Sequence, residues 1–171
     1  FWVESGKPVA ILFQNNDVMP HNLVITAAGE LESVGRAAEE LDGATTTNYV
    51  PDLPTVLFYS GLINPGETER MSFVGPTEPG DYPYVCTFPG HWRTMAGVMH
   101  VVNDVDAYLA KNPIAEPTEI GEVRKFVRDW KYEELVDKVT SMKSRSFANG
   151  KKLFTTVACF ACHQMKNVGG R

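Results

Sequence analysis

Residues 86–95 read CTFPGHWRTM, which places a thiol, an imidazole and a thioether within ten residues. The apolar segment YPYVC leads into this stretch and AGVMHVV follows it, so we expect a loop between two β-strands. Pro89 and Gly90 have the turn chemistry that lets such a loop fold back on itself. We therefore expect Cys86, His91 and Met95 to converge on one point.

Thiolate, thioether and imidazole ligands together favour copper, and two His, one Cys and a weak axial Met form the blue-copper arrangement. The loop supplies one histidine, so the second must come from elsewhere in the chain. His21 follows a proline in VMPHNLVI, at the head of a predicted strand, where its side chain can be held at one end of a sheet. His100 lies inside the predicted strand AGVMHVV and is expected to point to a sheet face. The predicted ligands are therefore His21, Cys86, His91 and Met95.

The residue after His21 offers a link between the two ligand segments. Asn22 has a side chain that can bond near Thr87, directly after Cys86. Hydrogen bonds of this kind orient metal ligands. We predict that Asn22 and Thr87 hold the two segments together.

Short apolar segments separated by turn residues fill most of residues 1–103. PVAILF, NLVIT, TVLFYSGLI and MSFVG are β-prone, and QNND, NPGE and EPGD have turn composition. Residues 29–43 are the exception, because their apolar residues recur with helical spacing up to Gly43. This pattern predicts an all-β sandwich with one helical insertion.

The pattern changes near residue 104. Residues 104–146 combine helical segments with the proline-broken stretch PIAEPTEIGEV, and nothing in them alternates like a strand. We predict a helical linker over 104–146, and a separate C-terminal segment over 147–171.

Residues 159–163 read CFACH, the C-x-x-C-H attachment signature of c-type haem. In such a site Cys159 and Cys162 bond to the haem and His163 binds the iron. A redox disulfide or half a zinc site is the alternative, but a zinc site needs a second ligand pair, and none is left once the copper ligands are assigned. A haem domain needs a larger core than 147–171 provides, so we expect haem to be absent or incomplete in this chain.

The charge is unevenly distributed along the chain. Residues 1–103 hold 4 Lys/Arg against 12 Asp/Glu, and residues 104–171 hold 12 against 9, for a net charge of −5. An acidic first part repels phosphate, which argues against nucleic acid as a partner. Solvated surface is the simple explanation, and a docking face toward the second segment or another redox protein is the alternative. No apolar run is long enough for a transmembrane segment.

CTFPGH with its following methionine resembles the copper loop of the cupredoxin family, the azurin- and plastocyanin-like blue copper proteins. VMPHN resembles the family's other ligand segment, and residues 29–43 resemble its flap helix. NGKKLF, ahead of CFACH, is similar to the first helix of class I c-type cytochromes. The resemblance implies an eight-stranded Greek-key β-sandwich over 1–103 with one type 1 copper, fused to the start of a cytochrome c domain. It implies the same ligands, with Met95 bound weakly.

These implications favour single-electron transfer between a redox partner and the linked haem domain, and not catalysis. Pro89 and Trp92 beside His91 are candidates for an apolar docking surface, and packing is the alternative role for Trp92. The chain has four histidines, too few for a trinuclear copper cluster, and no further set of histidines is left for a type 2 copper. A dinuclear copper centre needs two cysteines on the loop, and the loop has only Cys86. Two alternative functions stay open: an electron-entry domain of a larger periplasmic dehydrogenase or reductase, and copper storage or delivery. The same ligands could also bind zinc.

Copper loading and c-haem attachment both take place outside the cytoplasm, so we expect an exported, periplasmic bacterial protein. The ends of the sequence, Phe1-Trp2 and Gly169-Gly170-Arg171, do not look like natural termini. We expect a fragment of a longer protein whose export signal lies upstream.

Overall fold

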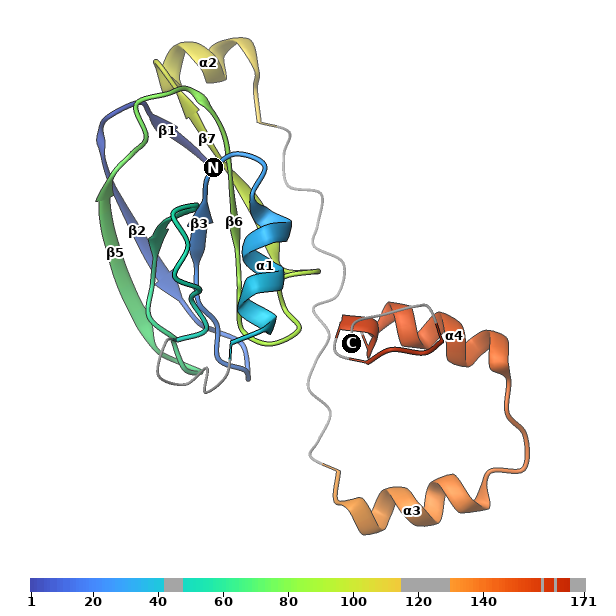
Figure 1. The fold of residues 1–171 in the computed structure, drawn as a ribbon. Coiled ribbons are helices and arrows are strands. Elements are labelled where there is room, and N and C mark those ends of the chain that lie inside the picture. The colour runs from blue at the N-terminus through green and yellow to red at the C-terminus, as the bar shows by residue number, and fades with distance from the viewer. Residues whose placement is uncertain (42–47, 115–129, 158, 162, 167–171) are drawn as a thin grey trace.

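The computed structural model describes residues 1–41, 48–114, 130–157, 159–161 and 163–166. Residues 2–102 form a β-sandwich of two sheets (Figure 1). The five-stranded sheet has the order β1-β7-β6-β3-β4, formed by β1 (Trp2–Glu4), β7 (Ala96–Val102), β6 (Gly80–Val85), β3 (Val24–Thr26) and β4 (Val56–Tyr59). The second sheet pairs β2 (Pro8–Gln14) with β5 (Thr68–Val74). The predicted β-sandwich is confirmed.

The two-stranded sheet shows why these sequences form strands. Along β2, PVAILFQ, exposed and half-buried residues alternate strictly, and β5 follows the same alternation with Met71 fully inside. Side chains of a strand point to opposite faces in turn, so one face of this sheet meets solvent and the other meets the core. Phe73 on the inner face stacks on Phe58 of β4, with ring centroids 4.1 Å apart.

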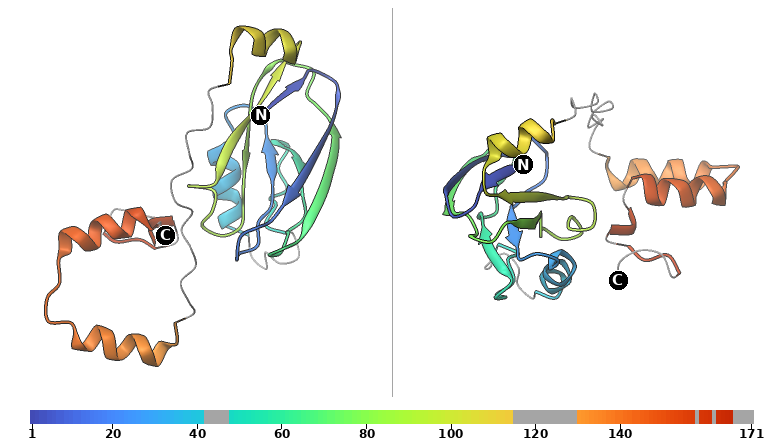
Figure 2. Two further views of the ribbon diagram at one scale, coloured as in Figure 1. Left: turned by 180° about the vertical axis from the view of Figure 1, so that it is seen from behind. Right: turned by 90° about the horizontal axis from the view of Figure 1, so that it is seen from above.

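The sandwich has two clusters of buried residues, on opposite faces of the five-stranded sheet. Between the sheets lie Val3, Ile25, Met71, Met99 and Val101. The second cluster holds Val24, Val34, Val85 and Trp92, under helix α1 (Leu31–Glu39). Neighbouring residues of β3 belong to different clusters because side chains alternate along a strand. Figure 2 shows α1 on the face of the sheet that is turned away from β2 and β5.

Helix α1 is the predicted helical insertion. Val34 and Ala38 are buried on the predicted apolar stripe, and Gly35 is buried beside them. The predicted stop at Gly43 lies outside the described residues.

Two features of the sandwich differ from the expectation. The strand β1 was not predicted, and it pairs in parallel with β7, Trp2 opposite His100. The resemblance implied eight strands, whereas the part of the chain that the structure describes contains seven, with an isolated bridge between His21 and Ile63.

After the sandwich, the structure describes three helices and a short 3₁₀ turn. They are α2 (Val105–Lys111), α3 (Tyr132–Ser141), α4 (Phe147–Thr156) and η1 (Cys159–Ala161). The side chains of Asp104 and Ser146 cap α2 and α4 by accepting backbone N–H bonds from Ala107 and Asn149. None of the three α-helices has a buried residue. Most of the proline-broken stretch at 113–123 lies outside the described residues.

None of the helices described in the structure has the length and apolar character needed to cross a membrane.

Candidate metal centre

His21 is fixed by its backbone at the edge of the sandwich. Its N–H donates to the carbonyl of Ile63 at 3.0 Å, and its carbonyl accepts from the Ile63 N–H at 2.8 Å. This two-bond bridge anchors the residue just before β3 begins. The residue is 5% exposed, so packing holds the ring as well.

The loop that follows β6 carries the other two ligand candidates. The Cys86 N–H donates to the Met95 carbonyl at 3.0 Å, and the Met95 N–H donates to the His91 carbonyl at 2.8 Å. Gly90 has a φ of 81°, a left-handed conformation that favours glycine and turns the chain back ahead of His91. The loop is therefore closed by its own hydrogen bonds between the two strands that carry it.

Asn22 ties the two ligand segments together. Its Nδ2 donates to Thr87 Oγ1 at 2.8 Å, and its Oδ1 accepts from the Thr87 N–H at 2.8 Å. A further bond runs from Nδ2 to the carbonyl of Asn48 at 2.9 Å. Asn22 is 1% and Thr87 is 2% exposed, so these bonds are buried. The two segments are thus linked directly beside His21 and Cys86.

Three donor atoms converge where the two segments meet. Cys86 Sγ lies 3.6 Å from His21 Nδ1 and 3.5 Å from His91 Nδ1, and the two Nδ1 atoms are 3.2 Å apart. A point equidistant from all three atoms lies about 2.0 Å from each, close to the ~2.0–2.1 Å of metal–nitrogen bonds and the ~2.3 Å of metal–sulfur bonds. The three donors fit a metal ion in trigonal coordination, with the two imidazoles and one thiolate that blue copper requires.

Burial shifts the pKa of two of the three donors, Cys86 and His91. Burial raises the pKa of the Cys86 thiol, only partly offset by hydrogen bonds with Asn22 and Phe88. The pKa of His91 is lowered, first by burial and then by repulsion from His21. His91 is therefore neutral with a lone pair available, while the thiol proton has to be displaced when a metal binds.

Met95 is positioned differently from the other three candidates. Its backbone closes the loop, but its side chain is 40% exposed. Axial ligation by Met95 stays a prediction.

Trp92 has a packing role. It is 8% exposed and lies in the cluster under α1, where Gly35 leaves room for its ring. A side chain in this position does not offer the exposed surface that docking needs, so the packing alternative for Trp92 is the one that fits. Pro89, the other docking candidate, is exposed.

The neighbouring Arg93 joins the loop to the helix. Its guanidinium forms an ion pair with Glu39 of α1, including a bond of 3.0 Å from Nη2 to Oε2, and lies 4.4 Å from the centre of the Trp92 ring. Partial burial raises the pKa of Glu39, but the hydrogen bonds and charge of Arg93 outweigh it, and the net effect is a lowered pKa.

The remaining predicted residues lie elsewhere. His100 is outside the cluster, stacked on Trp2, with its Nδ1 2.7 Å from Asp81 Oδ1. In the C-terminal segment the His163 N–H donates to the Cys159 carbonyl at 2.9 Å, and Cys162 lies outside the described residues.

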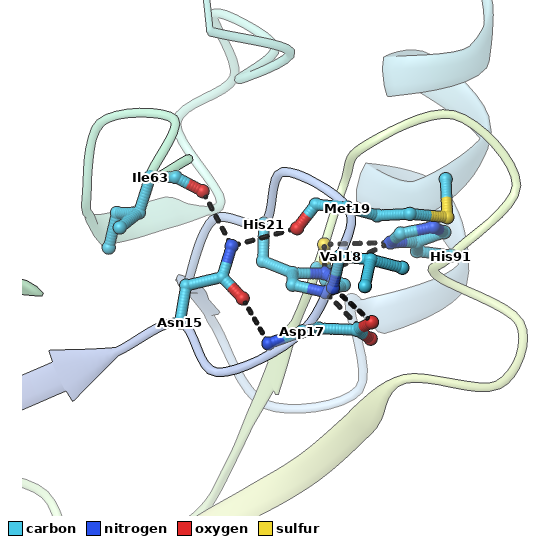
Figure 3. Close-up of polar contacts among 8 residues, drawn as sticks. Asn15, Asp17, Val18, Met19, His21, Ile63 and His91 are labelled. Carbon is cyan, nitrogen blue, oxygen red and sulfur yellow. Dashed lines mark hydrogen bonds and ion pairs between the residues drawn. The ribbon is translucent and has the colours of Figure 1, made fainter. Parts of the chain in front are cut away.

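The sequence reasoning missed two residues beside His21. Asp17 Oδ2 lies 3.2 Å from His21 Nε2, and Asn15 accepts the Asp17 N–H at 2.9 Å (Figure 3). Both belong to the QNND stretch, whose composition predicts only a turn. The available signal was a carboxylate four residues before a predicted metal-binding histidine.

The pKa of Asp17 is lowered. The main cause is the hydrogen bond from the Val18 backbone N–H, and the hydrogen bond and charge of His21 add to it, while burial opposes them.

Comparisons with known proteins agree with this geometry. Residues 2–102 match the family of copper binding proteins described as the plastocyanin/azurin family. Auracyanin-A of Chloroflexus aurantiacus is 38% identical over 103 residues, which are 59% of this chain and 62% of that protein, so less than two thirds of that relative is matched. Azurin-1 of Alcaligenes xylosoxydans xylosoxydans is 34% identical over 90 residues, 51% of this chain and 68% of that protein.

A solved structure supports the same assignment. The structure of auracyanin A, described as a "blue" copper protein of the green thermophilic photosynthetic bacterium Chloroflexus aurantiacus, superposes with a TM-score of 0.54 at 32% identity, over 60% of this chain and 84% of that one. The family match covers more than half of the chain and contains all three converging donors. The chain therefore belongs to the plastocyanin/azurin family of copper-binding proteins.

Proposed function

We propose that the chain is a blue-copper electron carrier with one type 1 copper, held by His21, Cys86 and His91 and weakly by Met95. The observation that carries the proposal is the triangle of donor atoms with sides of 3.2, 3.5 and 3.6 Å. When bound, copper supplies a one-electron couple whose potential depends on its ligands and their surroundings.

The chain's own residues give that couple a fixed environment. The His21–Ile63 bridge and the buried Asn22–Thr87 bonds hold the ligand segments in place, and Cys86, at 3% exposed, is shielded from water. Donors that are held in place by packing need little rearrangement when the charge at the site changes. A site of this kind suits electron transfer better than the release and exchange of a stored metal.

A partner is expected to approach where the ligand segments meet solvent. Exposed apolar side chains on these segments include Val18 at 62% and Met19 at 42%, together with Pro89. Exposed apolar side chains that gather on one surface are typical of protein contact sites. We propose that a redox protein docks here, close to the half-buried His91.

The second part of the proposal concerns the C-terminal segment. We infer that Cys159 and Cys162 attach a c-type haem and that His163 binds its iron, in a cytochrome c domain of the longer protein. The C-x-x-C-H signature supports this, and so does an apolar hollow of about 310 Å³ beside α4, lined by Phe147, Leu153, Phe154, Val157 and Met165 among others. The copper centre would then exchange electrons with this haem, and both cofactors favour an exported, periplasmic protein.

The haem proposal has its own test. The longer protein, expressed with the bacterial c-haem maturation machinery, should keep a covalently bound haem on a denaturing gel. Replacing Cys159 and Cys162 by alanine should abolish that signal without altering copper binding. Haem retained by the double variant would contradict the attachment.

The experiment that tests the copper proposal is titration of the metal-free chain with Cu²⁺. The expected result is binding of one copper per chain with an intense blue absorption and a reversible one-electron potential. Copper binding without the blue absorption and without a reversible couple would overturn the electron-transfer assignment in favour of storage or delivery. Zn²⁺ is expected to compete for the same three donors without giving colour.

A further inference from the structure

The two nitrogens of His21 face different partners. Nδ1 faces Cys86 Sγ and His91 Nδ1, whereas Nε2 lies 3.2 Å from Asp17 Oδ2. A neutral imidazole has one N–H donor and one lone pair. The carboxylate can only accept, so it places the proton on Nε2 and leaves the Nδ1 lone pair for a metal.

The backbone of Asp17 is held in a turn by hydrogen bonds to the side chain of Asn15. Asn15, 2% exposed, donates from Nδ2 to the carbonyls of Met19 at 2.7 Å and Ile63 at 2.9 Å, and its Oδ1 accepts from the Asp17 N–H at 2.9 Å (Figure 3). These three bonds use the whole amide of a buried side chain to shape the turn. They also connect the turn to Ile63, which bridges His21.

The two oxygens of the Asp17 carboxylate have separate roles. Oδ1 accepts the Val18 N–H at 2.6 Å, and Oδ2 is the oxygen that faces His21 Nε2. The first bond fixes the rotation of the carboxylate, so that the second oxygen stays aimed at the ring. The side chain of Asp17 is 54% exposed while that of His21 is 6% exposed, so the carboxylate lies between the buried ligand and the solvent.

We propose that Asp17 is a positioning residue for the metal centre: it fixes the His21 tautomer that presents Nδ1 and adds a negative charge behind that ligand. Asn15 is the residue that holds Asp17 in place. The proposal rests on the proposed copper function, and it goes further by assigning control of the redox couple to a carboxylate outside the ligand set.

The charge has a definite direction of effect. A carboxylate hydrogen-bonded to the outer nitrogen of a ligating histidine raises the basicity of that ligand. A more basic ligand and a nearby negative charge both favour the more positive ion, Cu(II), over Cu(I). Asp17 is therefore expected to lower the reduction potential of the centre.

The test compares Asp17→Asn and Asp17→Ala with Asp81→Asn in the whole chain. Asp81 belongs to the second carboxylate–histidine pair, with His100, at the start of β6 and roughly 16 Å along the strand from Cys86. It matches Asp17 in chemistry but not in position. The probes are Cu²⁺ and Cu⁺ for the potential, and nitrogen NMR of the metal-free chain for the His21 tautomer.

We expect Asp17→Asn to weaken Cu(II) binding relative to Cu(I) binding by about tenfold. For a one-electron couple, this corresponds to a rise of about 59 mV in the reduction potential. Asp17→Ala should in addition give a mixture of His21 tautomers in the metal-free chain. Asp81→Asn should change neither the potential nor the His21 signals. Nε2 protonation of His21 in the parent chain and its partial loss in Asp17→Ala would support the proposal without any metal.

Two results would overturn the proposal, and they separate it from the copper function. A blue parent chain with an unchanged potential and unchanged tautomer in both Asp17 variants would refute the role of Asp17 alone. A parent chain that binds copper without blue colour would refute the proposed function and the role of Asp17 together.

Discussion

The sandwich and the C-terminal segment contain the same kinds of soft donor but support them differently. Cys86 and His21 in the sandwich are buried and held by hydrogen bonds, whereas His163 and Met165 in the C-terminal segment are exposed and Cys159 is half-buried. None of the residues in 104–166 whose burial the structure describes is buried. Residue types that bind metals thus occur in both regions, but among the residues that the structure describes, which leave out Cys162, the sandwich alone holds three such donors at ligand distances.

The largest expected difference between the regions concerns their cysteines. Replacing Cys86 by serine removes the thiolate from the donor triangle, so we expect loss of the blue absorption and at least about a hundredfold loss of Cu²⁺ affinity. Cys159→Ser, in the exposed segment, should leave both unchanged. Absorption and competitive copper titration measure the effect, and a blue Cys86→Ser variant would break the comparison.

Two helical glycines, one in each region, test how closely their helices are packed. A Cβ on Gly35 of α1 would lie 2.4 Å from a ring carbon of Trp92, so Gly35→Ala should destabilise the sandwich by up to about 3 kcal/mol. A Cβ on Gly150 of α4 would meet nothing within 4 Å, and Gly150→Ala should stabilise its helix by about 0.5–1 kcal/mol. Urea unfolding followed by tryptophan fluorescence measures the first effect, and circular dichroism at helical wavelengths measures the second. An unchanged midpoint for Gly35→Ala would contradict the close packing of α1 on the copper loop.

Two asparagines test the buried hydrogen bonds. Asn22→Ala leaves the Thr87 N–H and hydroxyl without their buried partner, which we expect to cost about 2 kcal/mol and to broaden the copper spectrum. Asn112→Ala removes an exposed bond to the Tyr108 carbonyl and should change stability by less than about 0.5 kcal/mol. Both free energies of unfolding are measured with denaturant. An equal loss in the two variants would show that burial of the Asn22 bonds does not add to stability.

The smallest expected effect depends on pH. The pKa of Glu39 lies below its unfolded value of 4.5, so its ion pair with Arg93 stabilises the fold fully above that pH, and the stabilisation is lost as the pH falls through the folded pKa. Glu39→Gln should therefore cost about 0.5 kcal/mol at neutral pH and nothing in strong acid. Glu40→Gln, at the neighbouring exposed position, is the control. A cost for Glu39→Gln that stays the same at both pH values would contradict the ion pair.

Much of the sandwich could be predicted because its signals are local. Alternation along β2 and β5 and the helical stripe of α1 each lie within one element, and they gave the right element types. The strand β1 has only three residues and pairs in parallel with β7, nearly 100 positions away, so no local pattern indicated it.

In the candidate site, too, the residues marked by a local pattern could be predicted and those that depend on distant contacts could not. The donors were predictable from the spacing in CTFPGHWRTM and from the few histidines available. The burial of Trp92 depends on Gly35, a contact between α1 and the loop that neither stretch specifies alone. The role of Asn15 in holding Asp17 depends on Ile63, 48 residues further along, so turn chemistry alone could not reveal it.

The central claim is that His21, Cys86 and His91 together hold one copper ion, and X-ray absorption spectroscopy of the copper-loaded chain tests it most directly. The predicted result is a short copper shell of two nitrogens and one sulfur at about 2.0–2.3 Å. A shell of nitrogen and oxygen atoms without a short copper–sulfur bond would contradict it.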